Sequence, residues 1–204
     1  MANETGVLAG RTPGISLSKR GSKQAKTLVK YLSSFKFDVI VSSPLERCLQ
    51  TIEPYLKKHQ ITLIEMNEFQ EMDYGSWSGK ELKKLSKKKD WRIIQERPET
   101  FTFPNGESFT EAATRVRVGL KKIEKENSNQ SILVVSHGDI IKMATTVSLG
   151  LPLKNFQKLT IEPASLTSIN LVGQKLLFLN QKAGRRPRTR NMIQGFLLGG
   201  DSDK

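Results

Sequence analysis

Apolar residues recur along the chain in two patterns, one typical of buried strands and the other of amphipathic helices. Short, mostly apolar runs of the kind found in strands buried on both faces occupy residues 37–43 (FDVIVSS), 61–66 (ITLIEM) and 132–136 (ILVVS). Two later runs, 165–172 and 175–180, flank a turn around Val172-Gly173-Gln174. These last two runs predict a β-hairpin.

The segments between these runs have a helical period. Residues 17–35 place Ala25, Leu28, Val29 and Leu32 on one face, which predicts a first helix. Ser43 as N-cap and Pro44 at the first helical position predict the start of a second helix. Further helices are expected over the lysine-rich residues 80–90, over 107–126 and over 140–150. Strands that alternate with helices indicate an α/β fold, a mostly parallel sheet with helices on both faces.

The length and composition suit one soluble globular domain. The chain has 204 residues with 37% hydrophobic and 26% charged content, enough for a substantial core. We expect the folded domain to span residues 1–180. Residues 181–204 mix a basic cluster with glycines and show no clear period, so we expect a disordered basic tail there.

Targeting signals and cysteine pairs are not evident. No apolar run approaches the roughly 18 residues of a membrane span, and the first residues do not resemble a secretory signal. Cys48 is the only cysteine, so no intrachain disulfide can form. We therefore expect a cytoplasmic protein without membrane contact.

The formal net charge of +13 raises the question of nucleic-acid binding. Six lysines lie within residues 80–89, but a lysine run on a surface helix is usually a solvated face. The aromatic residues are not interleaved with these lysines as they are on a base-stacking platform. The charge suits an anionic ligand, and nucleic acid is not the favoured partner.

Polar residues of catalytic type come after three of the strand-like segments. Ser42 and Ser43 lead into a helix start, a position that binds anions, and Arg47 lies one turn later as a candidate phosphate clamp. Glu71 and Asp73 precede a glycine-aromatic turn, and a carboxylic acid placed there could protonate a leaving oxygen. Each has a structural alternative, because arginines on helices and acids in turns are common.

The third candidate is His137, which comes directly after the strand 132–136 and precedes Gly138. Ligands in open α/β sheets collect at the carboxyl ends of strands, and glycine allows close approach of a ligand to the backbone. A single histidine at such a place is more often structural than catalytic. The combination with the other two segments is what favours a functional site.

Together these segments resemble the histidine phosphatase superfamily, also called the phosphoglycerate mutase-like family. The similar stretches keep the order of the family and extend from residue 1 to about 170: LAGRTPGISLSKRGSKQA, VSSPLERCLQT, EMDYGSWSGKEL, PNGES and VVSHGDIIK. The resemblance implies a three-layer α/β/α fold of the phosphoglycerate mutase-like type. It also implies an enzyme that transfers a phosphoryl group through a phosphohistidine.

The resemblance assigns roles residue by residue. Arg47 would clamp the phosphoryl oxygens, and His137 would be the second histidine, which hydrogen-bonds the phosphoryl group. Glu71 would donate a proton to the leaving group and then activate water, with Asp73 as the rival for that role. Asn3 would match an asparagine that helps hold the phosphate. The resemblance implies a small phosphate monoester as substrate, with no metal and no cofactor.

The chain departs from the family at the nucleophile. The family opens with a strand that ends in Arg-His-Gly, and the residues MANETGV resemble the family sequence just after that motif. The only His-Gly pair is His137-Gly138, and His59 lies among lysines in KKHQ. We therefore expect the chain as written to lack the first strand and the nucleophile, and to be inactive on its own.

Three interpretations remain open at this stage. The favoured one is that the natural protein is longer and that Met1 is an internal methionine taken as the start. The others are a degenerate, non-catalytic paralogue that binds phosphorylated ligands, and a basic nucleic-acid-binding derivative. A phosphatase is favoured over a mutase because no long insertion is evident. The sequence leaves open the substrate and whether the protein is a homodimer.

Overall fold

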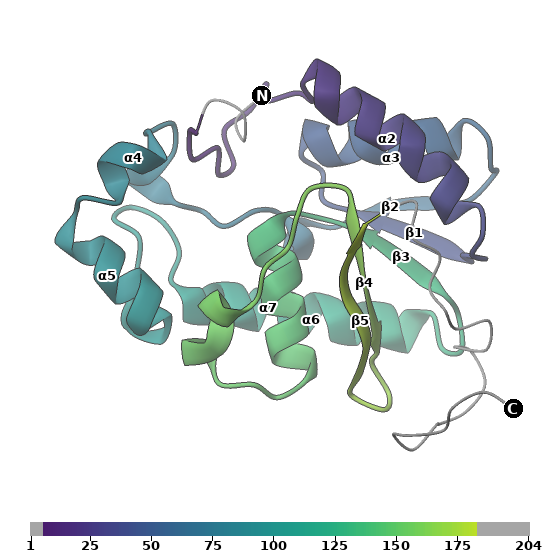
Figure 1. The fold of residues 1–204 in the computed structure, drawn as a ribbon. Coiled ribbons are helices and arrows are strands. Elements are labelled where there is room, and N and C mark those ends of the chain that lie inside the picture. The colour runs from purple at the N-terminus through teal and green to yellow at the C-terminus, as the bar shows by residue number, and fades with distance from the viewer. Residues whose placement is uncertain (1–5, 183–204) are drawn as a thin grey trace, which may run out of the picture.

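A sheet of three parallel strands lies at the centre of the computed structural model, which describes residues 6–182 (Figure 1). The strands are β1 (Val39–Ser42), β2 (Leu63–Glu65) and β3 (Ile132–Val135), in the order β2-β1-β3. All three lie inside the runs predicted to be strands, and their parallel direction is also as predicted. Asn3 and nearly all of the predicted tail, residues 183–204, lie outside the described residues.

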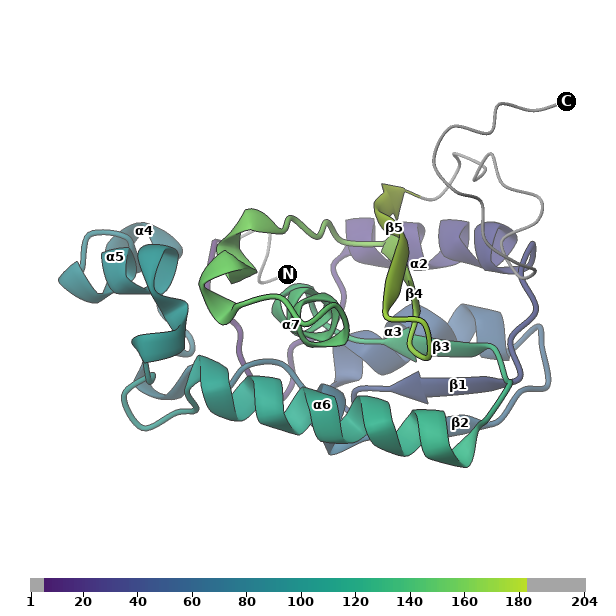
Figure 2. The ribbon, with the colours of Figure 1, turned by 90° about the horizontal axis from the view of Figure 1, so that it is seen from below.

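Helices cover both faces of this sheet (Figure 2). They are α2 (Lys19–Leu32) and α3 (Glu46–Leu56) on one face, and α6 (Phe109–Glu126) and α7 (Gly138–Ser148) on the other. Successive residues of a strand point to opposite faces of the sheet. In β1, Ile40 packs against α2 and α3, whereas Val41 packs against α6 and α7. The predicted three-layer α/β/α arrangement is confirmed.

The remaining elements lie beside the sheet. They are the short helices α4 (Leu82–Leu85) and α5 (Lys89–Glu96), the 3-10 turns η1 (Asn67–Phe69), η2 (Gly75–Trp77), η3 (Pro98–Thr100) and η4 (Leu153–Lys158), and the strands β4 (Ser165–Asn170) and β5 (Lys175–Lys182). The last two pair antiparallel, so the predicted hairpin is confirmed. No helix in residues 6–182 is long and apolar enough to cross a membrane.

Two of the predicted helix starts and spans are wrong. The second helix begins at Glu46, because Leu45 is extended and occupies the N-cap position without a side-chain cap, while the Ser43 hydroxyl lies against His137. The lysine-rich helix predicted over 80–90 is interrupted between α4 and α5. Lysines three or four positions apart repel one another on a helix, which destabilises a continuous helix here. Burial contributes little to offset this repulsion, because Leu85 is the only buried residue of α4.

The outer edge of β3 is open. No strand within residues 6–182 pairs with it, since β1 takes the other edge and the β4–β5 hairpin forms a sheet of its own. All four residues of β3 are apolar, yet all four are only partly buried. An unpaired edge of this composition is a site at which a further strand can add.

Helix α6 begins at a well-defined point, which fixes the residue just before it. The Ser108 hydroxyl accepts a hydrogen bond from the Glu111 backbone N–H, and the Glu111 carboxylate accepts one from the Ser108 N–H. This capping box fixes the residue at which α6 begins. Glu107, which directly precedes the N-cap, is thereby held near the carboxyl edge of the sheet.

Two loops cross at close range beside that edge. The Ser76 N–H donates to the Pro104 carbonyl at 2.8 Å, and the Glu107 N–H donates to the Asp73 carbonyl at 2.9 Å. Gly75 permits this approach in two ways, because its φ is +50° and a Cβ there would overlap the Pro104 oxygen and the backbone of Asn105. The loop that carries Glu71 is thereby joined to the loop that leads into α6.

The crossing can be tested by comparing two glycines. Gly79 also has a positive φ, +79°, but a Cβ there would meet nothing within 4 Å. Gly79→Ala should cost about 1–2 kcal/mol in the free energy of unfolding, from backbone strain alone. Gly75→Ala should cost at least about 2 kcal/mol more, because it adds steric overlap. Equal unfolding midpoints in urea for the two variants would contradict this account of the crossing.

Candidate functional site

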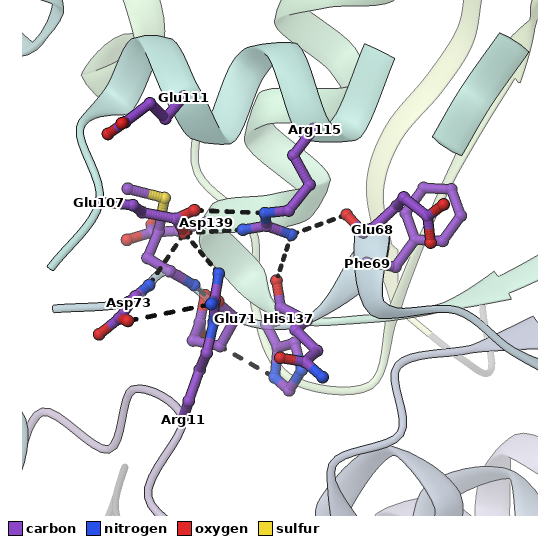
Figure 3. Close-up of polar contacts among 12 residues, drawn as sticks. Arg11, Glu68, Phe69, Glu71, Asp73, Glu107, Glu111, Arg115, His137 and Asp139 are labelled. Carbon is purple, nitrogen blue, oxygen red and sulfur yellow. Dashed lines mark hydrogen bonds and ion pairs between the residues drawn. The ribbon is translucent and has the colours of Figure 1, made fainter. Parts of the chain in front are cut away.

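Three segments meet at the carboxyl edge of the parallel sheet. β1 leads to Ser43 and to the first turn of α3, which carries Arg47, and β3 leads to His137 at the N-cap of α7. The loop after β2 brings Glu71 alongside, as Figure 3 shows for Glu71 and His137. The structure therefore brings together three of the four predicted site residues, and the fourth, Asn3, is outside the described residues.

His137 is enclosed and held through both ring nitrogens. The side chain is buried, with Nδ1 3.2 Å from Arg47 Nε and Nε2 2.8 Å from Ser43 Oγ. Burial, helped by the positive charges of Arg47, Arg115 and Arg11, lowers the pKa of His137 to about 3. The ring is therefore neutral at physiological pH.

Arg47 is a cation whose hydrogen-bond partners are neutral groups. Its Nε donates to His137, and its Nη2 donates to the Gly10 carbonyl at 2.8 Å. None of the ion pairs found within residues 6–182 neutralises this guanidinium. A cation beside the N-terminal turn of α3 favours an anion at this place.

Glu71 is a largely buried carboxyl group that faces His137. Its Oε2 lies 3.9 Å from His137 Nδ1, its Oε1 accepts from the Met72 N–H at 3.0 Å, and its side chain is 15% exposed. Burial and the negative charge of Asp139 raise the pKa of Glu71 to about 8, against the opposing effects of Arg47 and Arg115. Glu71 therefore carries a proton near neutral pH, as a general acid requires.

Asp73, the rival of Glu71, lies in a different environment. Its side chain is 41% exposed, its Oδ1 accepts from the Gly75 N–H at 2.9 Å, and its Oδ2 lies 3.9 Å from Arg11 Nη1. The bond to Gly75 is a turn contact two residues along the chain. The geometry thus separates the two acids, since Glu71 faces His137 whereas Asp73 closes the turn.

Glu107 is the centre of a charged cluster that holds the Glu71 loop (Figure 3). Its Oε1 accepts from Arg115 Nη2 at 2.7 Å, from Arg11 Nη2 at 3.0 Å and from the Asp73 N–H at 2.9 Å. The two arginines then reach the backbone on either side of Glu71. Arg115 donates to the Gln70 carbonyl at 3.0 Å, and Arg11 Nε donates to the Glu71 carbonyl at 2.8 Å.

Sequence reasoning did not single out this cluster or the contacts of Tyr74. The Tyr74 hydroxyl donates to Asp139 at 2.8 Å, which places the Asp139 carboxylate near Glu71 and accounts for part of its pKa shift. Arg11 and Glu107 do lie in stretches, LAGRTPG and PNGES, that resemble family motifs. That resemblance was the one signal in the sequence that pointed to them.

A metal site does not form among these residues. Within the described part of the chain, no three His, Cys, Asp or Glu side chains are arranged so that they could hold a metal ion. The polar groups that converge here are instead a guanidinium, an imidazole and a protonated carboxyl. This set suits the binding of an anion and the transfer of a proton.

Comparison with known proteins decides the family. The sequence profile of the histidine phosphatase superfamily (branch 1) matches residues 1–182. The chain belongs to the histidine phosphatase superfamily. The predicted family is thus confirmed, and the chain is a phosphohydrolase by family.

Relatives within the histidine phosphatase superfamily cover most of the chain. Phosphoserine phosphatase 1 of Hydrogenobacter thermophilus is 33% identical over 175 residues, which are 83% of this chain and 83% of the relative. The adenosylcobalamin/alpha-ribazole phosphatase of Escherichia coli is 27% identical over 195 residues, which are 89% of this chain and 91% of the relative.

Solved structures of the superfamily share the fold. The alpha-ribazole phosphatase of Shigella flexneri superposes with a TM-score of 0.77 at 25% identity, over 92% of this chain and 95% of its own. A mycobacterial glucosyl-3-phosphoglycerate phosphatase gives a TM-score of 0.80 at 21% identity, over 89% of this chain and 94% of its own. These proteins have the same overall architecture as this chain.

The Glu107 cluster makes a prediction about stability. Glu107→Gln would leave the partly buried Arg11 and Arg115 without their shared carboxylate. It should cost up to roughly 3–5 kcal/mol in the free energy of unfolding, the scale for a broken buried ion pair. Glu81→Gln is the matched control, because Glu81 pairs with Lys84 on the surface and should cost less than about 1 kcal/mol. Similar losses in the two variants would show that the cluster is not a stabilising unit.

Proposed function

We propose that this domain hydrolyses a small phosphate monoester and that the site at the carboxyl edge of the sheet binds its phosphoryl group. The observation that carries the proposal is the convergence of Arg47, His137 and Glu71 there. Arg47 supplies positive charge, and Glu71 supplies a proton near neutral pH. Phosphoryl transfer depends mainly on positioning and on charge stabilisation, which these groups can provide.

Each residue has a defined part in the proposed reaction. The Arg47 guanidinium and His137 hold the phosphoryl oxygens and stabilise the charge that develops on them. Glu71 gives its proton to the oxygen of the departing alcohol, and the resulting carboxylate then takes a proton from the water that attacks the phosphoenzyme. The Glu107 cluster keeps Glu71 at its place by holding the backbone on both sides of it.

The attacking histidine has to come from outside the described site. The sequence contains two histidines, and His59 stacks on Tyr55 at the far end of α3 with its Nε2 3.0 Å from Ser33 Oγ. We propose that the nucleophile lies at the end of a strand, absent from the printed sequence, that pairs with the open edge of β3. The carboxyl end of such a parallel strand would lie beside His137.

The named relatives act on small phosphorylated compounds such as phosphoserine and alpha-ribazole phosphate, and we propose a substrate of that size. A second candidate is supported by the same shortage of histidines, namely a non-catalytic domain that binds phosphorylated ligands. Both candidates require the anion site at Arg47. They differ in whether a histidine added beside β3 restores turnover.

Phosphate binding to the 204-residue chain tests the anion site. Inorganic phosphate should bind near neutral pH, and Arg47→Ala should weaken its affinity by roughly 10- to 100-fold, the loss expected for a charge-assisted hydrogen bond. Arg92→Ala is the control, because Arg92 is exposed on α5 and pairs with Glu96. Isothermal titration would measure the affinity. Equal affinity in the Arg47 variant and the parent would remove Arg47 from the site.

Turnover distinguishes the two candidates. The 204-residue chain should show negligible hydrolysis. An N-terminal extension of roughly 10–15 residues, a strand of about 5–6 residues that ends in Arg-His-Gly, should restore hydrolytic activity. In the extended protein, Arg47→Ala should reduce kcat/KM by roughly 2–4 kcal/mol of transition-state stabilisation. Robust activity of the printed chain, or an inactive but folded extended protein, would contradict the proposal.

Glu71 can be tested in the extended protein through the leaving group. Glu71→Gln should slow alkyl phosphates much more than activated aryl phosphates, which leave without help from an acid. For alkyl phosphates the parent rate should fall as pH rises through about 8, because the Glu71 proton is then lost. Asp73→Asn is the control and should affect both substrate types alike. If Asp73→Asn instead gave the selective loss, Asp73 would be the acid.

A further inference from the structure

The hydrogen bonds around His137 identify which ring nitrogen carries its proton. Arg47 Nε is 3.2 Å from His137 Nδ1, and a guanidinium N–H can only donate. Nδ1 must then be the unprotonated nitrogen of the neutral ring. The proton lies on Nε2, which is 2.8 Å from Ser43 Oγ.

Ser43 is the partner that receives this proton. It is fully buried, and a hydroxyl both accepts and donates. Cys48 Sγ is the other atom near Nε2, at 3.5 Å, but sulfur is a weaker acceptor than a hydroxyl oxygen. Burial raises the pKa of the Cys48 thiol to about 12, so it stays uncharged, and it shares a hydrogen bond with Ser43. A chain of contacts thus runs from Nε2 through Ser43 to Cys48.

This arrangement is unsuited to a bound anion unless the ring changes. With its proton on Nε2, His137 presents a lone pair at Nδ1, on the side that faces Arg47 and Glu71, and a lone pair repels a phosphoryl oxygen. A hydrogen bond to that oxygen needs a proton at Nδ1. The ring can gain it either by becoming a cation or by moving to its other neutral tautomer.

The surroundings of the ring favour the neutral route. The ring is buried, and the positive charges of Arg47, Arg115 and Arg11 act against a second proton on it. The neutral route needs a partner for Nε2 that can reverse its role from acceptor to donor. Ser43 can do this by rotating its O–H bond, whereas a carbonyl or a carboxylate could not.

We propose that Ser43 is a positioning residue that accepts the His137 Nε2–H in the free site and, by reversing its hydroxyl, lets neutral His137 donate Nδ1–H to a bound phosphoryl oxygen. The exchange conserves protons: the ring takes one from water at Nδ1 and returns the Nε2 proton to water. Arg47 moves its N–H from Nδ1 to the anion. The inference rests on the proposed function, because it assumes that a phosphoryl group binds at Arg47.

The composition of the chain makes a direct test practical. With only two histidines in the sequence, ¹⁵N-labelling of histidine gives two sets of ring signals, and His59→Asn removes the set from the far end of α3. Two-bond ¹⁵N–¹H spectra distinguish the Nε2–H tautomer, the Nδ1–H tautomer and the imidazolium. At pH 7 the free chain should show Nε2–H, and saturation with inorganic phosphate should convert it to neutral Nδ1–H.

Two variants separate Ser43 from its neighbour. In Ser43→Ala the free ring should keep Nε2–H, because Arg47 still donates to Nδ1, but phosphate should no longer convert the ring to neutral Nδ1–H. Phosphate affinity should fall roughly 5- to 30-fold, the effect of a buried polar group left without its partner. Cys48→Ala removes the other contact with Nε2 and should keep the Nε2–H tautomer, with phosphate affinity within about threefold of the parent. Urea unfolding would establish that both variants are folded.

The outcomes distinguish this inference from the proposed function. A free ring found as Nδ1–H or imidazolium would overturn the role of Ser43, as would a Ser43→Ala ring that phosphate converts to neutral Nδ1–H as fully as in the parent. Arg47-dependent phosphate binding with a doubly protonated ring would overturn the tautomer exchange and leave the phosphatase function standing. Failure of phosphate to bind would overturn both the function and the exchange, while the tautomer of the free ring would still show whether Ser43 accepts the Nε2 proton.

Discussion

The pairing of β1 with β3 is the constraint on which the rest of the site depends. Ser42 lies opposite Val135 in a parallel register, so Ser43, the first residue after β1, and His137, the second after β3, emerge close together. The 2.8 Å contact between them is a direct result of that register. A shift by one residue would exchange the two faces of each strand and separate this pair.

The arginines near His137 fall into two groups, those that pair with a carboxylate and the one that does not. Glu107 is shared by Arg11 and Arg115, so two of the three arginines near His137 are paired with a carboxylate and hold the backbone there. Arg47 contacts neutral groups and keeps its charge available. Positive charge is in this way concentrated at the helix start beside His137, where an anion would bind.

The fold could be predicted from the sequence, and so could the residues that meet at the carboxyl edge of the sheet, because both depend on local patterns. Apolar runs that end in polar residues located β1 and β3 and, with them, Arg47 and His137. The contacts of Glu107 were not readable, because Arg11 lies 96 positions away and only the folded chain brings them together. The start of α3 was misjudged for a related reason. Ser43 has the character of an N-cap, but its hydroxyl contacts His137 as well as the Leu45 N–H, and the helix begins only at Glu46.

The lowered pKa of His137 and the raised pKa of Glu71 have a consequence for how the site responds to pH. One group loses its proton at about pH 3 and the other at about pH 8. Between these limits neither of these two groups changes its charge. A phosphate monoester, by contrast, takes up its second negative charge near pH 6. Across this range the ionisation of the ligand, and not that of His137 or Glu71, therefore changes how strongly the ligand and these two groups attract each other.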